Sequence, residues 1–146
     1  GGDVTIHVGL SDSGSGGDVT FIGGATTDSD ESGGNVVLLS GSSYESSSGA
    51  VIIGSANAGR RGTSGSVVLR TGTSSEGNTG SLSLSTSHAA TGRAGEIEIL
   101  VGAGESGDGG DLTFGAGDVY ASEHTGGSLN LLAGKGLGSE SSRGGS

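Results

Sequence analysis

The sequence predicts an all-β fold, namely a short-coil, two-sided β-solenoid with roughly nine coils of 15–18 residues. Three observations predict it. The phrase Gly-x-Φ-x-Φ, in which Φ is a large apolar residue, recurs along the chain at steps of 15 to 17 residues. Its two apolar residues alternate with other residues, as on one face of a β-strand. The chain contains no Pro, which cannot donate to a strand ladder.

The first half of each unit is the predicted strand. Its glycine is the first position of the unit, at Gly2, Gly17, Gly34, Gly49, Gly65, Gly80, Gly95, Gly110 and Gly127. In repeat proteins each unit buries its apolar residues against its neighbours, so we expect two buried ladders. The third positions of the units form the first expected ladder, which consists of Val4, Val19, Val36, Val51, Val67, Leu82, Ile97, Leu112 and Leu129. The fifth positions form the second expected ladder, which consists of Ile6, Phe21, Leu38, Ile53, Leu69, Leu84, Ile99, Phe114 and Leu131.

The second half of each unit is polar and small, and it predicts a looser return segment between two glycine bends. Position 8 is usually Gly, which suits a sharp bend or a positive φ. Position 10 is mostly small, as in Ser43 and Ser74, and we expect it to face the apolar residues across a thin core. An antiparallel meander with loops of about nine residues is the alternative architecture.

Residues 1–146 are predicted to form a single β-solenoid repeat array. The chain opens in phase at Gly1-Gly2 and closes at Arg143–Ser146, which is the start of a tenth unit. Solenoids normally end in polar caps, and none is evident here. We therefore expect a segment of a longer chain, or a filament protomer that self-associates.

Composition limits the classes of partner. The formal net charge is −10 and the pI is about 4.4, which argues against nucleic acid and anionic membranes. No apolar run approaches the length of a membrane span. Gly accounts for 35 of 146 residues, a content also typical of flexible linkers, but the periodic apolar residues favour an ordered array.

Catalytic chemistry has little support in the sequence, and we expect no enzyme activity, no cofactor and no metal site. His7, His88 and His124 fall in distant units at unrelated positions, so no catalytic triad can be argued. The acidic run Asp28–Glu31 lacks the glycine and the spacing of an EF-hand loop.

The outward positions of the predicted strands carry a candidate lateral contact patch. It consists of Ile22, Val37, Leu39, Ile52 and Val68. A contiguous exposed apolar patch often marks a contact surface, so we expect this one to pack against another copy or another layer.

The phrases Gly-Ser-Val67-Val-Leu69-Arg-Thr-Gly72-Thr-Ser-Ser and Gly-Ser-Leu82-Ser-Leu84-Ser-Thr carry a resemblance. They resemble Gly/Ser-rich repetitive extracellular or surface β-solenoid proteins of microbes and algae. This resemblance implies a structural, adhesive or filament role outside the cell or on its surface. Separately, the Ser/Thr-rich composition of the return segments permits O-linked glycans, and polysaccharide is a partner in the alternative function below.

The alternative function is an ice- or polysaccharide-binding β-solenoid module, because the coil length is similar to that of short-coil ice-binding proteins. Those proteins use a regular Thr ladder. In this chain the Thr ladder at position 4 is interrupted by Val37, Ile52, Val68, Glu98 and Asn130.

Overall fold

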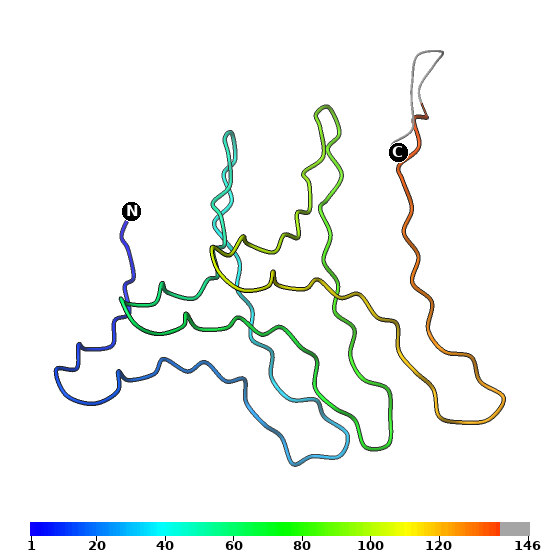
Figure 1. Cartoon of the computed structure of the whole chain (residues 1–146), viewed down its shortest axis with the longest axis horizontal. Coiled ribbons are helices and arrows are strands. Elements are labelled where there is room, and N and C mark those ends of the chain that lie inside the picture. The colour runs from blue at the N-terminus through cyan, green and yellow to red at the C-terminus, as the bar shows by residue number, and fades with distance from the viewer. Residues whose placement is uncertain (138–146) are drawn as a thin grey trace. The chain divides into compact units, whose positions relative to one another are not determined.

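The structure, a computed structural model, describes residues 1–137 (Figure 1). The chain divides into two compact units, Gly1–Arg70 and Thr71–Ser146. The expected start of a tenth repeat at Arg143–Ser146 lies outside the described residues.

The predicted β-solenoid is wrong, because residues 1–137 contain no helix and no strand. A β-strand exists only when its backbone N–H and C=O groups pair with a neighbouring strand. The alternation of apolar residues decides which side chains share a face, but it supplies no partner for the backbone. Gly loses the most conformational freedom on ordering, so a chain this rich in glycine needs a strong compensating contact to form a sheet.

The two predicted ladders are not buried either. No residue in the described part of the chain is buried, and the eighteen ladder residues are between 50% and 92% exposed. Within residues 1–137, only Gly23 and Ala89 are partly covered. A single copy of the chain therefore has no hydrophobic core over residues 1–137.

The described chain alternates between extended apolar segments and closed loops, which can be followed in Figure 1. The apolar segments are 2–8, 17–23, 34–40, 49–55, 65–71, 80–86, 95–101, 110–116 and 127–133. The closed loops are 9–16, 24–33, 41–48, 56–64, 72–79, 87–94, 102–109 and 117–126. Every bend and turn of residues 1–137 falls in one of these loops.

Each loop is closed by a contact between position 7 of one unit and the first glycine of the next. A methyl group on Gly17 would lie 2.8 Å from Cγ1 of Val8, and one on Gly110 would lie 2.9 Å from Cγ1 of Val101. Position 7 also lies near the next unit glycine at the other junctions of the described chain, at longer distances in every case except Gly23–Gly34. The other pairs are Gly23–Gly34, Ser40–Gly49, Ser55–Gly65, Thr71–Gly80, Thr86–Gly95 and Ala116–Gly127. At Gly17 and Gly110 a side chain would therefore displace the side chain at position 7, whereas at Gly49, Gly65, Gly80 and Gly95 a methyl group would make only an ordinary contact, at 3.5 to 3.8 Å.

Backbone hydrogen bonds close three of the loops. The N–H groups of Gly34, Gly49 and Gly127 donate to the carbonyls of Gly24, Gly41 and Gly117 at 2.8, 2.9 and 2.9 Å. All three acceptors are position-8 glycines. This local, hairpin-like closure is nearer to the alternative meander than to the solenoid, but no strand ladder follows it within residues 1–137.

Position 10 has a different role from the one expected. Its hydroxyl bonds to the backbone inside the loop rather than facing a core. Ser43 Oγ accepts from the Ser46 N–H at 3.0 Å, and Ser74 Oγ accepts from the Gly77 N–H at 2.9 Å. Thr26 Oγ1 likewise accepts from the Asp28 N–H at 3.1 Å. Such local side-chain bonds favour turns over regular secondary structure.

Positive φ angles occur towards the ends of loops and not at the position-8 glycines. In the described chain, the positive-φ residues are Gly14, Gly62, Gly107 and Glu123. Glu123, with φ of 63°, is the one that bears a side chain, and this conformation is uncommon for such a residue.

Candidate contact surface

The candidate patch predicted from the sequence lies entirely in the unit Gly1–Arg70. Its five residues, Ile22, Val37, Leu39, Ile52 and Val68, are between 68% and 91% exposed. They belong to four successive apolar segments, so the patch is spread along the chain. Each side chain is available to a partner.

Two closed loops hold neighbouring parts of this patch together. The Gly34–Gly24 bond joins the end of the segment that carries Ile22 to the start of the segment that carries Val37. The Gly49–Gly41 bond does the same for the segments of Leu39 and Ile52. Sequence reasoning placed these residues on adjacent coils, whereas the structure connects them through the bases of loops.

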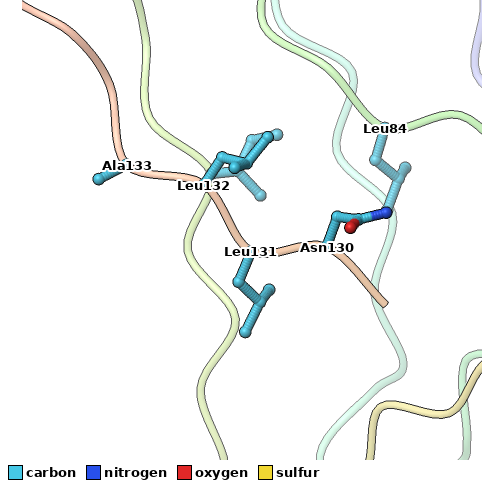
Figure 2. A pocket seen from close by; sticks show the side chains of 6 residues that line it. Leu84, Asn130, Leu131, Leu132 and Ala133 are labelled. Atoms are coloured by element: carbon cyan, nitrogen blue, oxygen red, sulfur yellow. The ribbon is translucent and has the colours of Figure 1, made fainter. Parts of the chain in front are cut away.

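A large open cavity lies within residues 71–137, shown in Figure 2. Its volume is about 1150 Å³, and it is lined by Leu84, Ile97 and the stretch Asn130–Ala133. Leu84 and Asn130 project toward each other from two different segments, whereas Leu131 and Leu132 point to opposite sides of their own segment (Figure 2). Sequence analysis did not anticipate this grouping, because Leu84 and Ile97 come from consecutive units but the stretch Asn130–Ala133 comes from two units further along the chain.

This cavity does not have the properties of a small-molecule site. Leu84, Leu131 and Leu132 are 65%, 83% and 91% exposed, so its walls already face water. Small-molecule sites bury most of the ligand surface, and these walls cannot do so. A smaller hollow of about 380 Å³ is lined by the consecutive residues Arg93–Glu96, a single stretch of backbone that provides no converging groups.

The ionisable side chains do not gather into a reactive centre. Over residues 1–137, no group of three or more His, Cys, Asp or Glu side chains lies in an arrangement that could hold a metal ion. Asp28, the first carboxylate of the acidic run, accepts a hydrogen bond from the Asp30 N–H through Oδ1 at 3.0 Å. This carboxylate therefore helps to shape its own loop. No helix of the described chain is long and apolar enough to cross a membrane.

The position-10 hydroxyls are the functional groups that sequence reasoning misread. The signal was present, since Ser or Thr stands nine residues after the unit glycine at Ser11, Thr26, Ser43 and Ser74. Ser11 also bonds within its loop, where its Oγ donates to the Ser13 carbonyl at 3.0 Å. A recurrent hydroxyl before a polar, glycine-containing stretch is typical of side-chain-capped turns.

Comparison with known protein families, with curated proteins and with solved structures found no match.

Proposed function

We propose that this chain is a structural repeat protein that associates with copies of itself, as part of an extracellular filament, an adhesive or a cell-surface assembly. The observation that carries the proposal is the regular exposure of its apolar residues. Nine apolar segments recur at steps of 15 to 17 residues, and none of their third- and fifth-position side chains is buried within one copy. A partner is needed to remove them from water.

The solvent-accessible surface area shows how little of its surface a single copy of the chain buries. The chain exposes 14949 Å². For its mass of 13.7 kDa, scaling relations give about 6600 Å² for a folded monomer and about 19,900 Å² for an extended chain. Burial of apolar area is the main favourable term in folding, and a single copy obtains little of it. Association between copies would supply the remainder.

The loops suit the outer surface of such an assembly. They are short and rich in Ser and Gly, and three of them are closed at the base by a backbone hydrogen bond, so they can project from a contact layer without unravelling. Their exposed hydroxyls are also compatible with O-linked glycans. The extracellular setting is supported by the resemblance in composition to secreted and surface repeat proteins.

Catalysis is not part of the proposal, because the three histidines lie in separate units and the two cavities are open to water. An ice- or polysaccharide-binding face would need a flat array of strands in register. Residues 1–137 form no strand, so no observation favours that function over association.

Sedimentation velocity across a range of protein concentrations tests the proposal. We expect assemblies that grow with concentration, together with fibres or sheets in electron micrographs. A monodisperse monomer at every concentration would show that the chain acts as a flexible linker instead.

Limited trypsin digestion gives a second measure of the same assemblies. Arg60 and Arg61 lie at the bend of loop 56–64, whereas Arg70 lies in apolar segment 65–71. Dispersed chains should be cut at all three residues. Assembled chains should still be cut at Arg60 and Arg61, while cleavage at Arg70 slows at least ten-fold because its segment is covered. Equal protection of loop and segment would contradict this arrangement.

A further inference from the structure

Two of the nine apolar segments differ from the others, because they are apolar on both faces and carry no charge. They are Asn35–Leu39, with the sequence Asn-Val-Val-Leu-Leu, and Ala50–Ile53, with the sequence Ala-Val-Ile-Ile. We call them the uncharged pair. Their Val, Leu and Ile side chains are between 54% and 91% exposed. Both faces of these segments can therefore enter a contact.

Charge separates the uncharged pair from most of the remaining segments. Position 2 is acidic in four other units, at Asp3, Asp18, Glu96 and Asp111. If such a segment paired in register with itself in a second copy, two carboxylates would lie opposite each other, which is destabilising. Segment 65–71 would oppose two Arg70 side chains in the same way. The uncharged pair brings no like charges together.

The surrounding sequence reinforces this difference. From Ser32 to Gly59 the chain contains one charged residue, Glu45, which lies at the bend of loop 41–48. The molecule as a whole has a formal net charge of −10, so two copies repel each other over most of their length. That repulsion is weak in the region of the uncharged pair, as it also is around segment 80–86, which carries no charge but is apolar on one face only.

Loop 41–48 holds the two segments together before any partner arrives. The Gly49 N–H donates to the Gly41 carbonyl at 2.9 Å, and the Ser46 N–H donates to Ser43 Oγ at 3.0 Å. The first bond closes the loop and the second fixes its bend. A partner therefore meets two linked segments at once, which lowers the entropy cost of binding the second.

We propose that the uncharged pair is the site at which a second copy of this chain binds, with each segment pairing with the same segment of the other copy as intermolecular β-strands. Short segments with high β-propensity, low charge and no Pro are those that stack in this way. This inference depends on the proposed self-association and names the segments that begin it.

The test compares two double variants that change the net charge equally. Val37→Lys with Ile52→Lys places a charge in each segment of the uncharged pair. The matched control, Thr20→Lys with Thr113→Lys, changes position 4 of two acidic segments. We expect the first variant to raise the concentration at which half of the protein sediments by at least ten-fold. For the control, this concentration should stay within about two-fold of the value for the unmodified chain.

The three outcomes separate the inference from the function on which it depends. If the unmodified chain never sediments, the proposed self-association fails. If it sediments and both variants shift equally, association is real but the uncharged pair is not its site. If only Val37→Lys with Ile52→Lys loses assembly, the inference is supported.

A cross-linking experiment locates the contact directly. The chain contains no Cys, so Ile52→Cys introduces a single thiol. In-register neighbours would place the two thiols within the distance that a disulfide spans. Mild oxidation of assembled Ile52→Cys should give covalent dimers, whereas Ser83→Cys, at the same position of segment 80–86, should give at least five-fold fewer. Equal cross-linking at both positions would overturn the inference.

Discussion

In several loops, the side-chain hydroxyl at position 10 accepts a backbone hydrogen bond and so fixes the bend. Ser43 and Ser74 accept a backbone N–H three residues ahead of them, and Thr26 accepts one two residues ahead. These bonds are exposed, so each is worth a modest net amount, about 0.5–1.5 kcal/mol. The same hydroxyl recurs at the same position of several units, so the contribution is repeated along the chain.

At the residue scale, Ser43→Ala should loosen loop 41–48. The Ser46 amide loses its acceptor and should exchange with solvent about two-fold to ten-fold faster, which corresponds to the worth of one exposed hydrogen bond. Solvent-exchange NMR on the dispersed protein measures this rate. Ser42→Ala is the control, since no hydrogen bond to that hydroxyl is recorded within residues 1–137. Equal changes in both variants would show that the Ser43 hydroxyl does not hold the bend.

At the scale of the loop, close approach at the base explains why a glycine stands at position 23. Gly23 and Gly24 are adjacent, yet they differ in what a side chain would meet. A methyl group on Gly23 would collide with the backbone carbonyl of Gly34, whereas a methyl group on Gly24 would meet nothing within 4 Å. Backbone atoms cannot rotate aside as a flexible side chain can.

Gly23→Ala should therefore open loop 24–33, and Gly24→Ala should not. Opening would break the bond from the Gly34 N–H to the Gly24 carbonyl, which is 2.8 Å long in the closed loop. The temperature coefficient and the exchange rate of the Gly34 amide report that bond. We expect both to move toward values of an unbonded amide in Gly23→Ala and to stay unchanged in Gly24→Ala. The reverse pattern would contradict closure by close approach.

The sequence located the loops more reliably than it described the segments between them. A bend was expected at position-8 glycines such as Gly41, but the bend of that loop lies at Tyr44–Ser46, and Gly41 and Gly49 stand at the base of the loop instead. These features depend on residues near one another in the chain. The strand state of Val36 or Val51 depends on a backbone partner, and no pattern within a segment identifies that partner. The candidate patch was likewise placed by assuming stacked coils, which residues 1–137 do not form.

For the whole molecule, the absence of buried residues over 1–137 determines the thermal behaviour of a single copy. Cooperative melting needs a core whose apolar surface is exposed all at once. Dispersed chains should therefore show no heat-absorption peak in calorimetry. Assembled chains should show one, with a midpoint that rises with protein concentration because association stabilises the ordered state.

Calorimetry can also contradict the conclusion that a single copy of the chain has no hydrophobic core. A folded monomer of 146 residues would absorb about 100 kcal/mol on melting, at about 0.7 kcal/mol per residue. A peak of that size at a midpoint independent of concentration would mean that one chain buries a core by itself.

The closures between position 7 and the next glycine have a consequence for synthesis. Each joins residues that are 9 to 11 positions apart, as in Val8 with Gly17 and Gly23 with Gly34. A loop of ten residues closes in about 10–100 ns, whereas a ribosome adds about 5–20 residues per second. Every loop therefore closes long before the next unit has been translated. Residues 35–53 leave the ribosome while later units are still being made, so neighbouring nascent chains on one messenger RNA can begin to pair before any of them is released.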